Sequence, residues 1–191
     1  MRVVAIAATL SLIAAQAVAA GWQDRITPHD AGKLRRLDAA WTSALADARP
    51  AHRAELDALV DPDAGLADPT PPPGVYRCRT VKLGDPGGAG LAFVAYDWFR
   101  CRIERSPRGE LTLAKISGSQ RSFGVLYPDR ARRLTFLGAV SLGADETAMG
   151  YGAMAERNQA GVVERIGPRR WRLVLPWPEY ESKLDLIELA R

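Results

Sequence analysis

Two short stretches, Tyr76-Arg77-Cys78-Arg79 and Phe99-Arg100-Cys101-Arg102, repeat one pattern of aromatic residue, arginine, cysteine, arginine, and they hold both cysteines of the chain. Side chains alternate between two faces along a β-strand, so each cysteine shares a face with an aromatic residue and the arginines lie opposite. Antiparallel pairing of the two strands brings the sulfur atoms within bonding distance. The pattern therefore predicts a Cys78–Cys101 disulfide between neighbouring strands.

Strand patterns continue from this pair to the end of the chain, punctuated by Gly, Pro, Asp and Ser turns. The candidate strands are 75–83, 98–105, 110–117, 121–127, 133–141, 161–166, 169–176 and 183–190, with a doubtful one at 147–155. Short connections predict an antiparallel meander, which protects its edges best by closing on itself. We expect residues 75–191 to form an up-and-down, lipocalin-like barrel of about eight strands, with a β-sandwich as the alternative.

Alternation within these strands predicts which side chains fill the interior. The residues expected to face inward are Leu111 and Leu113; Phe123, Val125 and Tyr127; Leu134 and Phe136; and Trp171, Leu173 and Leu175. The last strand alternates less regularly, which suits a strand that helices partly cover.

The segment before the strands has helical spacing. Thr27 is a suitable N-cap, Pro28 suits the first helical turn, and Pro50 can end one helix and start another. An apolar stripe recurs at Leu34, Leu37, Trp41, Ala44, Leu45 and Ala48. We expect residues 21–60 to pack as helices on the barrel and the proline-rich residues 61–74 to link the two parts.

The first twenty residues have the three regions of a secretory signal peptide. Arg2 supplies a cation, residues 3–15 form an apolar run, and Ala17-Val18-Ala19 gives the small-residue pattern of a cleavage site. We expect residues 1–20 to be removed by cleavage near Ala19 or Ala20, leaving a periplasmic or secreted protein. No later segment has the roughly 20 apolar residues of a membrane span.

The formal net charge of +4 is mild, and it carries no block of like charges. We therefore expect no nucleic-acid partner. His29 and His52 are the only histidines, and neither has a cysteine or a cluster of acidic residues at metal-ligand spacing. We expect neither a metal nor a cofactor, and we find no nucleophile motif.

Several of these features together resemble a known family. They are Pro72-Pro73-Gly74-Val75-Tyr76-Arg77-Cys78-Arg79, Trp98-Phe99-Arg100-Cys101-Arg102, the capped helix with its central Trp41, and the ending Tyr180 to Leu189. The chain resembles the exported bacterial proteins grouped as domain of unknown function DUF4893. The resemblance implies an origin in a Gram-negative cell envelope and supplies no catalytic residues.

Two groups of side chains are candidates for ligand binding. The first is the arginine face of Arg77, Arg79, Arg100 and Arg102, in which Arg79 and Arg102 could hold an anionic group unless acids such as Glu104, Glu110, Asp185 and Glu188 neutralise it. The second is the aromatic group Tyr96, Trp98, Trp177 and Tyr180, near predicted strand ends. These aromatic side chains either line a pocket at the mouth of the barrel or plug it.

Three functions remain open on this basis. The first is a non-enzymatic envelope protein that binds a small ligand or a protein partner. The second is an inhibitor of an envelope or secreted hydrolase, with residues 21–24 or the 84–97 loop as the insert. The third is a hydrolase that uses paired carboxylates, Asp145 with Glu146 or Glu179 with Glu181.

Overall fold

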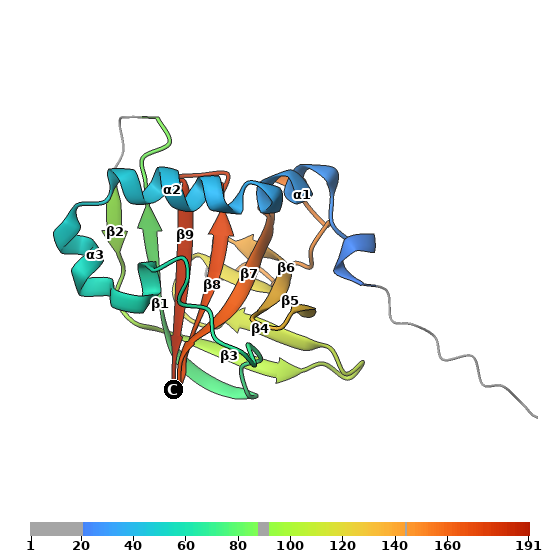
Figure 1. The fold of residues 1–191 in the computed structure, drawn as a ribbon. Coiled ribbons are helices and arrows are strands. Elements are labelled where there is room, and N and C mark those ends of the chain that lie inside the picture. The colour runs from blue at the N-terminus through green and yellow to red at the C-terminus, as the bar shows by residue number, and fades with distance from the viewer. Residues whose placement is uncertain (1–20, 88–91, 144) are drawn as a thin grey trace, which may run out of the picture.

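The structure is a computed structural model that describes residues 21–87, 92–143 and 145–191 (Figure 1). The helices are α1 (Pro28–Arg35), α2 (Leu37–Asp47) and α3 (Pro50–Leu56), with 3₁₀ turns η1 (Trp22–Asp24), η2 (Asp57–Val60) and η3 (Ala155–Arg157). The strands are β1 (Gly74–Leu83), β2 (Phe93–Ala95), β3 (Phe99–Arg105), β4 (Leu111–Lys115), β5 (Arg121–Arg130), β6 (Arg133–Ser141), β7 (Asn158–Gly167), β8 (Arg170–Pro176) and β9 (Leu184–Ala190). The predicted signal peptide and part of the 84–97 loop lie outside the described residues.

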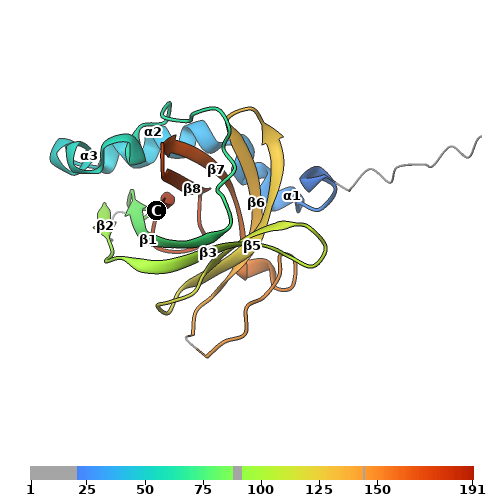
Figure 2. The same cartoon turned by 90° about the horizontal axis from the view of Figure 1, so that it is seen from below.

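The strands form one antiparallel sheet in the order β2-β1-β3-β4-β5-β6-β7-β8-β9. A further pairing between β1 and β9 joins the ends of this series, so eight strands close into a barrel and β2 is additional. Figure 2 shows the strands curving round a common centre. The predicted closed meander is therefore confirmed, and the sandwich alternative is not what the chain adopts.

Two details of the strand prediction differ from the structure. Residues 147–155 form turns rather than a strand, and β2 was not predicted. β2 pairs with Val81 to Leu83, on the edge of β1 whose first half pairs with β3. The chain crosses between these two pairings at residues 96–98, where the Tyr96 amide donates to the Thr80 carbonyl at 3.0 Å.

The predicted disulfide is confirmed inside the barrel. Cys78 and Cys101 are bonded, with their Cα atoms 5.8 Å apart, and both are fully buried. In the register of β1 and β3, Tyr76 lies opposite Cys101 and Cys78 lies opposite Phe99. Around the disulfide the barrel is filled by a core of Tyr76, Ile103, Leu111, Leu113, Leu126, Leu134, Phe136, Val163, Trp171, Leu173, Leu175, Ile187 and Leu189. Most of the residues predicted to face inward are in this list.

The inward face of β5 is the opposite of the predicted one. Phe123, Val125 and Tyr127 are only partly buried, whereas Leu126 is in the core. Gly124 lies directly opposite Gly138, and an added Cβ on Gly124 would be 2.6 Å from the Phe136 ring. The Phe136 ring occupies the space above the two glycines, so β5 contributes backbone rather than large side chains to this part of the core.

The helices cover the outer face of β1, β7, β8 and β9, as Figure 1 shows for α1 and α2. Thr27 caps α1 by accepting a hydrogen bond from the Asp30 amide at 3.2 Å, and Pro28 occupies the first turn. The apolar stripe of the helices packs on side chains of the strands in a second core, which contains Leu37, Ala40, Trp41, Ala44, Ala48, Leu56, Leu59, Val60, Val81, Leu83, Val162, Ile166, Val174, Leu184 and Leu186. This cover explains why β9 is buried on both faces.

Candidate functional site

One end of the barrel holds buried charged side chains instead of apolar ones. We call this end, where β1 ends and β9 begins, the upper mouth, and define it by Thr80, Lys82, Lys115, Gln120 and Asp185. A cavity of about 180 Å³ is lined there by Thr80, Tyr96, Phe99, Lys115, Ser119 and Gln120. A narrower cavity of about 60 Å³ includes Lys82, Gln120, Gln159, Tyr180, Glu181 and Asp185 in its lining. Gln120 lines both.

Lys115, the last residue of β4, is only 7% exposed. Its Nζ donates to the Gln120 carbonyl at 2.7 Å and lies 4.1 Å from the centroid of the Phe99 ring. Within the described residues no carboxylate forms an ion pair with it. Burial, with smaller effects of the charges of Lys82 and Arg121, lowers the pKa of Lys115 to about 8. The ammonium group is therefore held in a cavity without a counter-charge.

Lys82, on β1, is equally buried but is neutralised. Its Nζ lies 2.8 Å from Glu181 Oε2 and 3.5 Å from Asp185 Oδ2. Burial acts to lower the pKa of Lys82, but the two carboxylates outweigh it and the pKa is raised. Burial also raises the pKa of Asp185, which accepts a hydrogen bond from Ser182 Oγ at 2.5 Å. The two buried lysines thus differ in having or lacking acidic partners.

The structure divides the four aromatic candidates into two pairs. Tyr96 lines the Lys115 cavity and Tyr180 lines the Lys82 cavity, and both side chains are exposed at the upper mouth. Trp98 instead lies on the outer face of β1, with the guanidinium carbons of Arg77 and Arg79 at 4.6 and 4.9 Å from its ring centroid.

Trp177 packs against the helices, where its Nε1 donates to the Arg36 carbonyl at 3.1 Å. The upper mouth therefore contains two of the predicted aromatic residues and not the other two.

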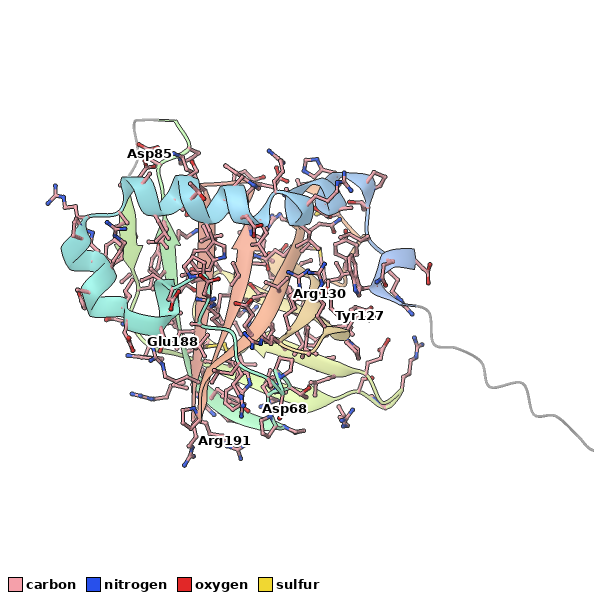
Figure 3. The ribbon with its side chains drawn as sticks, viewed as in Figure 1. Asp68, Asp85, Tyr127, Arg130, Glu188 and Arg191 are labelled. Carbon is pink, nitrogen blue, oxygen red and sulfur yellow. A yellow bond between two sulfur atoms is a disulfide. The ribbon has the colours of Figure 1, made fainter. Side chains whose placement is uncertain are left out.

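The arginine face is on the outside of the barrel and does not join the upper mouth. Arg77 lies opposite Arg100 in the register, and Arg102 lies opposite Val75. Arg79 Nε is 2.7 Å from Glu188 Oε2, so its charge is neutralised. Glu188, labelled in Figure 3, also forms an ion pair with Arg170 at 2.8 Å. Glu188 is therefore an acid that neutralises arginines on this outer face.

Three of the four acids in the predicted carboxylate pairs, Glu146, Glu179 and Glu181, each have a separate partner. Glu146 accepts from the Leu142 amide at 2.6 Å, and the pKa of Glu146 is lowered by this bond and by the Gly143 amide. Glu179 accepts from Lys33 Nζ at 2.5 Å, and Glu181 pairs with Lys82. These contacts give each acid a role in holding loops or balancing a lysine.

Lys82, Lys115, Gln120 and Asp185 were missed as site residues. For the two lysines, strand alternation contains the signal, whereas Gln120 lies in the loop between β4 and β5. Lys115 is two residues after Leu113 and therefore shares its inward face, and Lys82 shares the inward face of Cys78. A lysine at an inward position of a closed barrel is unusual, because charged groups are seldom buried without a partner.

In the part of the chain that the structure describes, no group of three or more His, Cys, Asp or Glu residues could hold a metal ion. None of the helices described is long and apolar enough to cross a membrane.

Comparison with known proteins places this chain in a family. The family model described as domain of unknown function (DUF4893) matches residues 22–189. No curated protein matches the chain, and no solved structure matches it. The matched region contains the three α-helices, both cysteines and the nine strands except the last residue of β9. The chain therefore belongs to the DUF4893 family, a domain of unknown function.

Proposed function

We propose that the protein is exported to the periplasm or secreted, and that it binds a small ligand with an anionic group at the upper mouth without catalysing a reaction. Support for export comes from the signal-peptide pattern of residues 1–20 and from the disulfide, which forms and persists in oxidising compartments. Support for binding comes from the cavity around Lys115.

The observation that carries the proposal is the buried ammonium of Lys115 in a cavity without an acidic lining residue. Burying a charge is costly unless a partner of opposite charge accompanies it. The lining of the 180 Å³ cavity supplies hydroxyl groups from Thr80, Tyr96 and Ser119, an amide from Gln120, and no carboxylate. A carboxylate or phosphate group would both neutralise Lys115 and accept hydrogen bonds from these donors.

The size of this cavity restricts the ligand. A volume of 180 Å³ is several times the roughly 30 Å³ of a water molecule in the liquid. It suits a compact organic acid or a phosphate group, and the filled core below it leaves the ligand at the mouth rather than in the centre of the barrel.

Protein binding and inhibition of a hydrolase stay predictions. The 21–24 segment proposed as an insert contains Trp22, which is partly buried against the barrel and lines the spaces beside β5. A side chain used for packing in this way is less available for insertion into another protein, so we rank inhibition below ligand binding.

Isothermal titration calorimetry of the protein produced from the full chain, against acetate, succinate, citrate and phosphate at low ionic strength, tests the binding proposal. We expect saturable binding of at least one of these anions and its loss in Lys115→Met. Lys183→Met is the matched control, because Lys183 pairs with Asp47 away from the cavity. Absence of binding by all four anions, or equal binding by Lys115→Met, would overturn the proposal.

Export is tested separately by cell fractionation with and without residues 1–20. We expect the full chain to accumulate outside the cytoplasm with Ala20 or Gly21 as its first residue, and the shortened chain to stay inside. A full chain that stays in the cytoplasm and keeps residue 1 would contradict export while leaving the binding proposal open.

A further inference from the structure

A larger cavity than the two at the upper mouth lies at the opposite end of the barrel. It has a volume of about 570 Å³. We call it the lower groove, and its lining is Gly21, Trp22, Arg25, Thr70, Arg105, Arg108, Gly109, Glu110, Leu111, Val125, Leu126, Tyr127, Pro128 and Leu134. Tyr127, labelled in Figure 3, lies on the side of β5 next to η1. This volume is in the range of about 300–1,000 Å³ that is typical of small-molecule sites.

The floor of the lower groove is apolar and continuous with the barrel core. Leu111, Leu126 and Leu134 belong to the core inside the strands and also line the groove. Val125 and Tyr127, on the other face of β5, extend this lining outward toward Trp22. A ligand in the groove would therefore meet leucine side chains at its inner end.

The rim of the groove is basic. Three arginines, Arg25, Arg105 and Arg108, line it together with a single acid, Glu110. Glu110 accepts a hydrogen bond from Ser106 Oγ at 3.4 Å. Arg105 Nη1 donates to the Gly109 carbonyl at 3.1 Å, which leaves most of its guanidinium donors for other acceptors. The charge of the rim therefore favours an anion.

A second observation is the indole of Trp22. Its Nε1 is buried without a hydrogen-bond partner among the described residues. The indole ring is part of the groove lining, where it adds an aromatic surface to the apolar one.

We propose that the lower groove binds a single-chain amphiphile, with its apolar chain on the leucine floor and its carboxylate or phosphate head at the arginine rim. The site is separate from the upper mouth. It selects for an apolar chain, whereas the upper mouth selects for a compact anion. An anion without an apolar chain has nothing to bury on the floor, whereas the Lys115 cavity is smaller and has a mostly polar lining. The two proposals can therefore fail independently.

Chain length is the first test of this proposal. Octanoate, decanoate, dodecanoate and dodecyl phosphate are titrated, below their micelle concentrations, into the protein produced from the full chain. Each added methylene that enters the groove should raise the affinity about fourfold. Dodecyltrimethylammonium has a similar chain with the opposite charge, and we expect it to bind at least tenfold more weakly than dodecanoate.

Variants assign the binding to the groove. The double variant Arg25→Gln/Arg108→Gln should weaken dodecanoate binding about tenfold while keeping the dependence on chain length, because it removes two charges and the contact of Arg25 with the Tyr127 ring but leaves the leucine floor in place. Arg53→Gln, on the exposed surface of α3, is the matched control and should bind as the parent protein does. Lys115→Met should also keep full dodecanoate binding.

Three results would each overturn the proposal. They are no binding of dodecanoate, equal affinity for dodecanoate and dodecyltrimethylammonium, and loss of dodecanoate binding in Lys115→Met but not in the double arginine variant. The last result would move the amphiphile to the upper mouth. Dodecanoate binding with the expected variant pattern supports the lower groove even if no small anion binds at Lys115.

Discussion

The guanidinium of Arg172, on β8, lies against the carboxylate of Glu164, on β7, with Nε and Nη2 at 2.8 and 2.7 Å from Oε2. The Arg172 side chain is fully buried. Its remaining donors reach the carbonyls of Ala58, Leu59, Asp61 and Pro62. Its Cζ is also 4.8 Å from the centroid of the Trp41 ring. One side chain therefore joins the barrel to the helices and to the segment that follows them.

Replacing Arg172 should loosen the helical cover. In Arg172→Met the Glu164 carboxylate and the carbonyls at the end of η2 lose their donors, and breaking a buried pair costs about 3–5 kcal/mol. Arg172→Lys should recover little of this stability, because one ammonium group cannot replace the planar set of guanidinium donors. Urea unfolding measures the change, with exposed Arg169→Met as the control, for which we expect less than about 0.5 kcal/mol. Similar unfolding midpoints for the two methionine variants would contradict this role.

The disulfide should contribute a large share of the stability. Cys78 and Cys101 are separated by 23 residues, and a crosslink over a loop of this size stabilises a fold by about 3 kcal/mol in the chain-entropy model. We expect Cys78→Ala/Cys101→Ala to unfold at a clearly lower urea concentration. A reducing agent should lower the midpoint of the parent protein and leave that of the double variant unchanged. A midpoint insensitive to both treatments would show that packing alone holds β1 to β3.

The glycine pair of β5 and β6 should not tolerate a side chain. A Cβ on Gly138 would lie 2.3 Å from the Phe123 carbonyl and 2.5 Å from the Phe136 ring, and backbone cannot move aside cheaply. Overpacking of this kind costs about 1–3 kcal/mol. Gly150→Ala is the control, since nothing lies within 4 Å of its added Cβ. Thermal unfolding compares Gly138→Ala with Gly150→Ala. Equal unfolding midpoints would show that the β5 backbone and the Phe136 ring do not approach Gly138 this closely.

This glycine pair also explains what the sequence could not reveal about β5. Alternation identifies an inward face by its large apolar side chains, and Phe123 and Tyr127 are larger than the residues between them. The inward position is instead held by Gly124, because Phe136 reaches across from β6 to fill the space. A contact between two strands cannot be inferred from the residue pattern of one strand alone. By contrast, the cysteine pair was predictable, since both local sequence patterns and the predicted export of the chain agreed on it.

The candidate site was the harder part to predict, for a related reason. Lys115 was not among the predicted site residues. Lysines are almost always at the surface, so a lysine within a strand does not by itself indicate a buried site. Alternation from Leu113 gives Lys115 an inward position, but only the closure of the barrel around β4 shows that this position is buried. The predicted aromatic group located the site in part, because Tyr96 and Tyr180 lie at the upper mouth. Trp98 and Trp177 do not, since cation–π contacts and helix packing hold them elsewhere.

Removing the charge of Lys115 should stabilise the protein in the absence of ligand. The pKa of about 8 in the folded protein is lower than the ordinary 10.5, so below pH 8 the folded state carries the full cost of burying the charge. At about 1.4 kcal/mol per pKa unit this cost is about 3 kcal/mol. We expect Lys115→Met to gain about 1–3 kcal/mol at pH 7.

The pH dependence of stability tests the origin of that gain. Between pH 8 and 10.5 the unfolded chain keeps a proton on Lys115 that the folded chain releases, so this group makes the parent protein more stable as the pH rises through that window. The advantage of Lys115→Met over the parent protein should therefore shrink from pH 7 to pH 10.5 in urea titrations. A constant difference would assign the gain to packing instead of charge.

Anion binding at the upper mouth should have the opposite dependence on pH. The ligand is attracted to the charged form of Lys115, whose pKa of about 8 is set by burial and by the charges of Lys82 and Arg121. Affinity should be constant below pH 8 and fall about tenfold per pH unit above it, because each unit then lowers the protonated fraction tenfold. Lys115→Arg keeps its charge throughout this range and should bind with the same affinity from pH 7 to pH 10. Calorimetry over this range measures both profiles, and a flat profile in the parent protein would remove Lys115 from the binding step.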